Sequence, residues 1–416
     1  MPDTGGWTTH SDSIESRGSW TAACLALAIL AVGFGAPLLV VVGLKPIGES
    51  LGAERSVIAL AGSLTWVGTG LGGILMGWTA DRIGIRAATS LGGVMTAAGL
   101  ALASTGSIWG LYVGHGLLIG LLGNGAMYAP LMVYVSRWFD KRRGTALALI
   151  SSGQYISGMV WPPLFQRGIA AFGWQTTMLL FAGVTLVLIL PLTLFTLRPA
   201  PEPLPITGAH AGVVLVRRPL GLPPNLVQGL LCLAGFFCCI PMALPYSHLV
   251  AYCTDLGISA TQGAAMLSVL LACAFLSRQF WGWYGDRAGG LRAVLAGSAC
   301  QCVAIGCFLL TQNEAGLFVV SAGFGLGFAG IIPSYALAIR ELFPSSEASW
   351  RVPTLLFTAM GGMAFGSWLG GVLYEHYAAY APAFAAGVVF NLANLVVVGS
   401  LVLRDRRTMR LTPAAA

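Results

Sequence analysis

Twelve long apolar runs constrain the fold of this chain more than any other sequence feature. A helix needs about 20 consecutive apolar residues to cross the hydrocarbon core of a bilayer. Every run has that length, and the runs cover residues 20–44, 55–79, 85–105, 108–136, 144–168, 174–197, 225–250, 260–284, 290–312, 315–339, 352–375 and 380–403. The sequence therefore predicts an all-α membrane protein with twelve transmembrane helices.

The composition excludes most classes of soluble protein. Charged residues make up 9% of the 416 residues, against about 25% in soluble domains. The 9 cysteines lie in or beside apolar runs without zinc-ligand spacing to histidine, so we interpret them as small apolar side chains. No run contains a phosphate-binding P-loop, and no nucleophile has a local base. We therefore predict no enzyme activity, cofactor or metal.

The basic residues predict the orientation in the membrane. If both termini lie inside, the inside segments hold eighteen Lys and Arg and the outside loops hold three, which are Lys45, Arg55 and Arg167. Cytoplasmic loops carry such an excess. This distribution of the net charge of +7 therefore predicts cytoplasmic termini rather than a nucleic-acid partner. We expect the membrane to be a bacterial plasma membrane.

A proline-rich connection divides the chain into two groups of six helices. Seven prolines lie in residues 198–224, which we interpret as a cytoplasmic linker. The predicted organisation is a cytoplasmic tail, a six-helix bundle, the linker, a second six-helix bundle and a second cytoplasmic tail, covering residues 1–19, 20–197, 198–224, 225–403 and 404–416.

A short motif occurs once in each half. Residues 77–84 read GWTADRIG and residues 282–289 read GWYGDRAG, and each copy ends the second helix of its half. One copy alone fits a simple helix end, but the repetition argues against that. Two parallel repeats are typical of transporters with a substrate site between the halves. The motif resembles the loop 2–3 motif of the major facilitator superfamily, and the resemblance implies a conformational gate at Gly77, Asp81, Arg82, Gly84, Arg86, Gly282, Asp286 and Arg287.

Arg278 is the first candidate for substrate binding. It lies inside an apolar run, two helical turns before Asp286, and its counterpart in the first half is Gly73. A charge within the membrane is costly and usually faces a substrate or ion path. The planar guanidinium matches a carboxylate through two hydrogen bonds. The alternative is that Arg278 extends to the headgroups or pairs with a helix end.

Polar and aromatic residues on three helices are further candidates. Asn124 and Tyr128 are four residues apart, so a helix places them on one face, where both can donate to an anion opposite Arg278. The alternative for this pair is helix–helix packing. Additional cavity-wall candidates are Gln154, Tyr155, Trp161 and Trp66, although Trp and Tyr also populate membrane interfaces.

A narrower resemblance involves helices 4, 5 and 8. The fourth run contains GNGAMYAP at residues 123–130, followed by RWFDKRRGTAL at residues 137–147. These strings and Arg278 resemble monocarboxylate transporters and bacterial oxalate/formate antiporter-like proteins, and the resemblance implies a carboxylate bound by Arg278. Leu38 and Ala274 stand where the animal carriers have a lysine and an aspartate tied to proton coupling. Met360 stands where oxalate carriers have a second cation.

His248 is the candidate for proton coupling. It follows Pro241 and Pro245 in a helix that these prolines can bend. Imidazole changes charge between pH 5 and 8, and no Asp or Glu lies deep in a predicted span. The alternative is a histidine at the outer interface.

The sequence thus predicts a secondary transporter of a small organic anion with one carboxylate. We expect alternating access, coupling to protons or exchange, and function as a monomer in the lipid bilayer. The alternatives are uptake of a larger, weakly charged compound such as a vitamin, or efflux of amphipaths. Because soluble signalling domains are missing from the predicted tails, a receptor fits less well.

Overall fold

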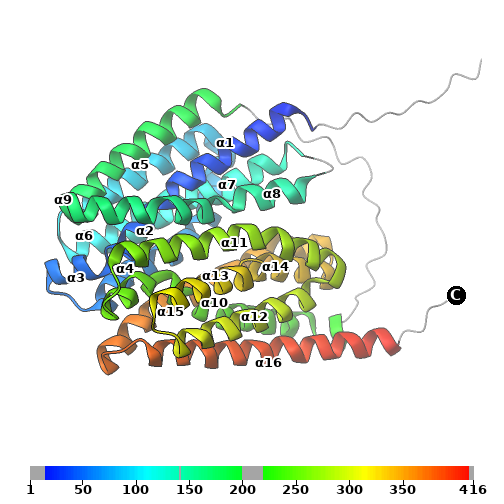
Figure 1. Ribbon diagram of the computed structural model, residues 1–416. Coiled ribbons are helices and arrows are strands. Elements are labelled where there is room, and N and C mark those ends of the chain that lie inside the picture. The colour runs from blue at the N-terminus through cyan, green and yellow to red at the C-terminus, as the bar shows by residue number, and fades with distance from the viewer. Residues whose placement is uncertain (1–14, 140–141, 199–218, 412–416) are drawn as a thin grey trace, which may run out of the picture.

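Helices account for almost all of the residues that the structure, a computed structural model, describes, namely 15–139, 142–198 and 219–411 (Figure 1). The helices of the first half are α1 (Arg17–Gly33), α2 (Gly35–Val42), α3 (Leu44–Leu51), α4 (Arg55–Ile83), α5 (Ile85–Ala103), α6 (Ile108–Tyr112), η1 (Val113–Asn124), α7 (Gly125–Ser136), α8 (Arg143–Ser151), α9 (Gly153–Pro191) and η2 (Leu192–Thr196). Those of the second half are η3 (Pro219–Gly221), α10 (Pro224–Asp255), α11 (Ala260–Ala288), α12 (Gly290–Leu310), α13 (Glu314–Phe328), α14 (Ile331–Leu342), α15 (Ser345–Tyr377) and α16 (Ala381–Leu411).

The twelve predicted crossings correspond to eleven helical segments, one of which is long enough to cross the membrane twice. Eleven segments of the described residues are long and apolar enough to cross a membrane, and Thr145–Thr196 spans 52 residues. Within that segment Gly173 has φ 79° and ψ 162°, which is not helical. Two crossings therefore meet at Gly173, where the sequence predicted two separate helices.

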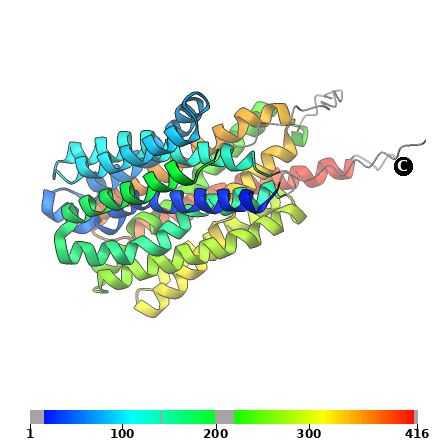
Figure 2. The ribbon, with the colours of Figure 1, turned by 90° about the horizontal axis from the view of Figure 1, so that it is seen from above.

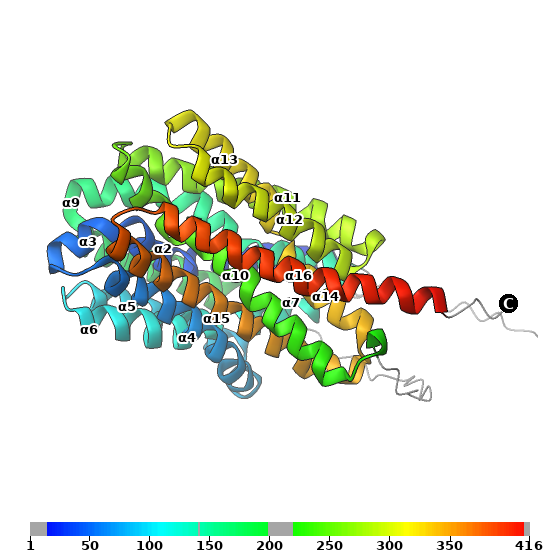
Figure 3. The ribbon, with the colours of Figure 1, turned by 90° about the horizontal axis from the view of Figure 1, so that it is seen from below.

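Several helix boundaries differ from the predicted runs. The helix α1 begins at Arg17, after a capping box in which Ser16 and Ser19 exchange hydrogen bonds with each other's backbone N–H. At the other end, α16 continues to Leu411 instead of ending at 403, and it extends past its neighbours (Figure 3). Most of the predicted linker, and parts of both predicted tails, lie outside the described residues.

The helices lie side by side in two groups that pack against each other (Figures 1 and 2). The main contacts between the groups join α4 to α15, α9 to α11, and α2 to α10. The beginning of α1 and the end of α16 lie at the same end of the bundle (Figure 1). We call this the inner end and the opposite end the outer end, after the orientation that the charges predict.

Small residues allow the closest helix contacts, and large apolar residues cover the periphery. A Cβ at Gly72 of α4 would lie 2.2 Å from the Leu121 carbonyl oxygen of η1, so only glycine permits this approach. On the outside, Leu310 is 85% exposed and Phe195 is 83% exposed. Such exposure is unfavourable in water but not in lipid, so these helices form a multi-pass membrane protein.

Candidate functional site

A central cavity of about 120 Å³ lies between the two groups of helices. Both groups contribute to its wall, which carries five aromatic rings and three methionines. Arg278 is the only charged side chain among the described residues that line it. The lining residues are Phe34, Trp66, Tyr128, Gln154, Tyr155, Cys239, Met242, Arg278, Phe328, Ala329, Ile332, Leu356, Ala359, Met360 and Met363.

The guanidinium of Arg278 has donors and a charge that the protein does not satisfy. Its Nη1 is 3.5 Å from the Ser151 carbonyl oxygen, and its Cζ lies 5.2 Å from the ring centroid of Tyr155. Its Nε is buried and has no hydrogen-bond partner. No carboxylate in the described part of the chain lies within 4.0 Å of it. An anion that entered the cavity would find Nε and the positive charge without a partner among the described residues.

A second cavity, of about 380 Å³, leads from Arg278 toward the inner end. Residues of α8 in the first half and of α11 and α14 in the second half line it, among them Thr145, Gly282 and Asp286. Because Arg278 lines both cavities, it lies where they meet. The inner cavity therefore extends from Arg278 to the second copy of the repeated motif.

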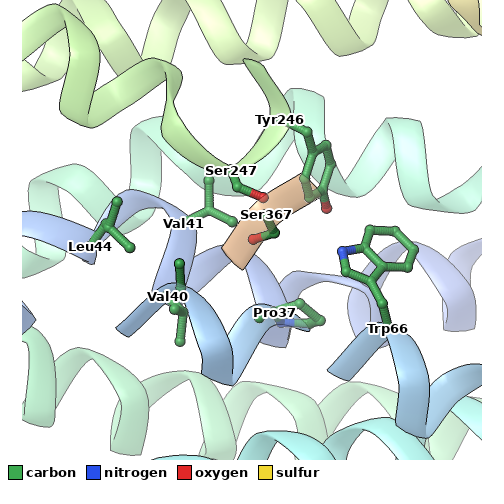
Figure 4. Close-up of a pocket in the computed structure, with 10 residues that line it drawn as sticks. Pro37, Val40, Val41, Leu44, Trp66, Tyr246, Ser247 and Ser367 are labelled. Carbon is green, nitrogen blue, oxygen red and sulfur yellow. The ribbon is translucent and has the colours of Figure 1, made fainter. Parts of the chain in front are cut away.

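The central cavity is closed toward the outer end. Beyond Trp66 lies a space of only about 10 Å³, lined by residues of both halves, including Tyr246, Ser247 and Ser367 (Figure 4). Such a volume holds at most one water molecule. Trp66 and Tyr246 form an edge-to-face ring pair with centroids 5.7 Å apart. This pair separates the central cavity from the outer end.

An ion pair and two tyrosines join the halves at the outer end. Arg55 of α4 donates from Nη1 to Asp255 Oδ2 at 2.5 Å and from Nη2 to Oδ1 at 2.7 Å. Its Cζ is 3.6 Å from the ring centroid of Tyr374, and Nη1 also donates to the Tyr380 hydroxyl at 2.9 Å. Lys45 lies 3.5 Å from the same Asp255 carboxylate. We call Arg55, Asp255, Tyr374 and Tyr380 the outer latch.

His248 belongs to this closed outer end rather than to the central cavity. It is fully buried, with Nε2 2.7 Å from the Ser367 carbonyl oxygen and Nδ1 3.1 Å from the Tyr380 hydroxyl. A carbonyl can only accept, so Nε2 carries the proton and Nδ1 accepts from Tyr380. The imidazole is thus bonded to a hydroxyl that Arg55 also contacts.

Most of the predicted binding residues lie together, and the others lie elsewhere. Tyr128, Gln154, Tyr155 and Trp66 line the central cavity with Arg278. The other three predicted residues are placed apart from it, namely Asn124, Trp161 and His248. Whether the residues that share the cavity bind substrate stays a prediction.

Asn124 and Trp161 pack inside the first half. Asn124 faces α1 near Gly33, and its amide atoms are buried without a hydrogen-bond partner. The indole of Trp161 donates to the Ala31 carbonyl oxygen at 2.8 Å and packs against Phe181. The expectation that Trp161 lines the cavity is therefore wrong in this conformation, because the indole bonds to the backbone of α1 instead.

The repeated motif has the same local geometry in both copies. Arg82 lies 3.5 Å above the ring of Trp78, and Arg287 lies 4.1 Å above the ring of Trp283. Each copy ends on a glycine with positive φ, which is 83° at position 84 and 87° at position 289. Arg86 donates from Nε to the Leu197 carbonyl oxygen. The side chain of Asp81 lies outside the described residues.

The first glycine of each copy is open in this structure. A Cβ at Gly77 or Gly282 would meet no atom within 4 Å. These glycines therefore do not mediate a tight helix contact in this state, in which the inner cavity separates the halves. Their predicted role as gates stays a prediction.

Comparison with known proteins identifies the family. The family pattern described as Major Facilitator Superfamily matches residues 21–349 and 231–416. The chain belongs to the major facilitator superfamily. This membership agrees with the predicted twelve-helix fold and makes the chain a membrane transporter, and the related proteins are transporters rather than enzymes.

Relatives of this superfamily member include named carriers from several organisms. Monocarboxylate transporter 13 of Bos taurus is 28% identical over 329 residues, covering 77% of this chain and 74% of the relative. Monocarboxylate transporter 11 of Homo sapiens is 27% identical over 419 residues, covering 96% and 73%. An uncharacterized MFS-type transporter of Bacillus subtilis (strain 168) is 23% identical and covers 85% and 87%. The monocarboxylate transporters agree with the narrower resemblance seen in the sequence.

Solved structures of the superfamily share this fold. A bacterial homologue of the human lysosomal transporter Spinster, in an inward-facing and unoccupied conformation, aligns with a TM-score of 0.75 and 14% identity over 97% of this chain and 100% of that one. A POT family transporter in complex with 5-aminolevulinic acid aligns with a TM-score of 0.68 and 16% identity, covering 93% and 96%. At these identities the similarity concerns the fold.

Sequence reasoning missed the outer latch of this transporter. In the sequence Arg55 is only one of three outside cations, and no motif marks Asp255, Tyr374 or Tyr380. The available signal was the scarcity of charge, because any charged residue at a span end in such a chain requires a partner or water.

Proposed function

We propose that this transporter carries a small organic anion with one carboxylate, which Arg278 binds. The observation that carries the proposal is the guanidinium without a carboxylate partner, where the central and inner cavities meet. A charge within the membrane costs at least about 2.5–3.5 kcal/mol, and a bound anion would offset that cost. Relatives named monocarboxylate transporters support the same class of cargo.

The polar groups of the central cavity suit a single carboxylate. Arg278 provides two parallel N–H donors, which match the two oxygens of one carboxylate. The hydroxyl of Tyr128 and the amide of Gln154 line the same cavity and make no hydrogen bond with other described residues, so they remain available to the cargo. A dianion would require a second cation, but Met360 lines the cavity where oxalate carriers have one.

The two ends of the pathway support alternating access. The outer end is closed by the outer latch and by the Trp66–Tyr246 pair, while the inner cavity reaches the central cavity at Arg278. Rocking of the two halves about the central cavity would open one end as it closes the other. Release of the cargo toward the inner end is the step that this conformation supports.

We further propose that His248 carries the coupling proton. In the neutral imidazole, Nδ1 accepts from the Tyr380 hydroxyl. A second proton would sit on that Nδ1, so the hydroxyl would lose its acceptor and face two cationic groups, the imidazolium and Arg55. Arg55 is in turn bound to the Asp255 carboxylate. Protonation would therefore weaken the outer latch and favour opening of the outer end.

Substitution of Arg278 tests the proposed cargo. Arg278→Lys keeps the charge and loses the planar fork, so uptake of a radiolabelled monocarboxylate into proteoliposomes should fall at least about ten-fold. Arg292→Lys on α12 is the matched control and should transport normally. Wild-type uptake by the Arg278 variant, at equal protein level, would contradict the proposal.

A larger, weakly charged cargo such as a vitamin, or an amphipath for efflux, is the second candidate. The apolar lining of the central cavity favours it. In that case transport would be insensitive to Arg278→Lys and to the charge of the cargo.

We place the carrier in a bacterial plasma membrane, as a monomer with cytoplasmic termini. A reporter fused to the C-terminus tests the position of that terminus.

A further inference from the structure

We infer that the cargo is a monocarboxylate whose apolar part is a single aromatic ring. The ring would occupy the central cavity and the carboxylate would reach Arg278. This inference rests on the proposed role of Arg278 as the carboxylate partner. It adds the chemical class of the remainder of the molecule.

The volume of the central cavity corresponds to one six-membered ring. The cavity measures about 120 Å³. An engineered apolar cavity of about 150 Å³ binds benzene in another protein. Two-carbon or three-carbon acids would leave part of this space empty, whereas two fused rings would have to extend past Arg278 into the inner cavity. The size of the cavity therefore suits an acid with one ring.

The lining chemistry suits an aromatic ring better than an aliphatic one. Two edge-to-face pairs hold the wall in place, Phe34 with Tyr128 at 5.6 Å and Tyr155 with Phe328 at 6.2 Å. Rings fixed in this way offer faces and edges to a further ring, and such contacts add to the effect of buried area alone. Methionine sulfur also contacts aromatic rings favourably, and Met360 is one of three methionines in the wall.

The position of the charge orients such a cargo. Arg278 lines the boundary with the inner cavity, while Trp66 closes the central cavity toward the outer end. A ring acid would therefore lie with its carboxylate toward the inner cavity and its ring toward Trp66. An acid without a ring would satisfy Arg278 and leave the aromatic wall without contacts.

A series of ligands tests the inference on the purified full-length transporter. Isothermal titration calorimetry is done with phenylacetate, acetate, cyclohexylacetate, indole-3-acetate and 2-phenylethanol. Phenylacetate should bind on the order of 100-fold tighter than acetate, because a buried ring adds a large apolar area. It should bind about three- to ten-fold tighter than cyclohexylacetate. Indole-3-acetate and the uncharged 2-phenylethanol should both bind more weakly than phenylacetate.

A variant that enlarges the cavity tests the size limit directly. Met360→Ala removes a side chain of the wall, so the affinity for indole-3-acetate should rise relative to that for phenylacetate. Met159→Ala is the matched control, because Met159 is 42% exposed on the periphery of α9. It should leave both affinities unchanged, and an equal effect of both variants would contradict the assignment of the cavity.

The outcomes separate this inference from the proposed function. If acetate and phenylacetate bind equally well, and both lose affinity in Arg278→Lys, the ring is wrong and the carboxylate site stands. If 2-phenylethanol binds as well as phenylacetate, and Arg278→Lys changes neither affinity, the carboxylate role and with it the proposed function are wrong, while the ring-binding cavity stands. Tighter binding of cyclohexylacetate than of phenylacetate would overturn the aromatic requirement.

Discussion

Removal of the Asp255 carboxylate should open the outer end of the transporter. Asp255 accepts two hydrogen bonds from Arg55 and lies near Lys45, so it is the anion that two cations of the first half share. Asp255→Asn retains the shape of the side chain and one acceptor oxygen but removes the charge. Arg55 would keep its contacts with Tyr374 and Tyr380. The latch should therefore weaken without being abolished.

The size of the effect follows from the burial of the pair. A hydrogen bond to a charged group contributes about 1.5–3 kcal/mol when it is buried, whereas exposed ion pairs contribute about 0.2–1 kcal/mol. The side chains of Arg55 and Asp255 are 15% and 20% exposed, which is between these cases. With one acceptor oxygen retained, we expect the outer-closed state to lose about 1–2 kcal/mol of stability. This loss raises the ratio of outer-open to outer-closed carrier about 5- to 30-fold.

Chemical labelling beneath the latch measures this ratio. Ser247 lines the small outer cavity and is buried in the closed state. A Ser247→Cys reporter, in a background without other maleimide-reactive cysteines, should be modified about 5- to 30-fold faster when combined with Asp255→Asn. Glu49→Gln is the matched control, because Glu49 is an exposed acid on α3. An unchanged rate with Asp255→Asn, or an equal rise with Glu49→Gln, would refute the reasoning.

Two further predictions concern His248 and Gly290, the first residue of α12. Uptake by His248→Gln should lose its dependence on external pH, while His376→Gln, at an exposed position, should retain it. A preserved pH profile would favour exchange or uniport instead. A Cβ at Gly290 would lie 2.3 Å from the Ala338 backbone nitrogen, so Gly290→Ala should lower the melting temperature by several degrees, in line with about 1–3 kcal/mol of overpacking. Gly282→Ala, whose added methyl group meets no neighbour, should leave the melting temperature unchanged. Equal melting temperatures of the two variants would contradict the close packing of α12 on α14.

The fold was predictable because lipid imposes a simple length rule on each apolar run. Hydropathy indicates which segments lie in lipid. It does not indicate where the backbone hydrogen bonds change from the α-helical to the π-helical pattern. The run 108–136 therefore became three elements, of which η1 is a π-helix. For the same reason the sequence predicted a gap between helices at residues 169–173. In the structure the helix is continuous there except at Gly173.

The candidate site was predictable where a single residue had few alternative explanations. Arg278 is a permanent charge inside an apolar run, and the structure places it on the central cavity. The spacing of Asn124 and Tyr128 predicted that both lie on one helix face. It did not predict which neighbouring helix covers Asn124. The close approach of α1 at Gly33 covers Asn124, one turn away from the cavity-lining Tyr128.

The outer latch could not be predicted from local patterns. Its ion pair joins residues 200 positions apart, and its tyrosine contact spans 325 positions. Nothing in the sequence around Arg55 indicates that Asp255 or Tyr380 is near. Only the packing of α4 against α15, and the position of α10 beside them, brings these side chains together.

The chemistry of the two ends of the carrier differs, and this difference bears on how the carrier moves. At the inner end the motif glycines Gly77 and Gly282 have free space around them, and Gly282 lines the inner cavity between the halves. At the outer end the charge of Arg55 is already paired with Asp255. In the proposed alternating-access cycle, closing the inner end would have to offset the cost of breaking this pair, which is at least the roughly 1–2 kcal/mol expected for removing the Asp255 charge alone. Helix contacts formed at the open glycines in the opposite conformation would be a physical source of that energy, because close backbone approach favours helix association in lipid.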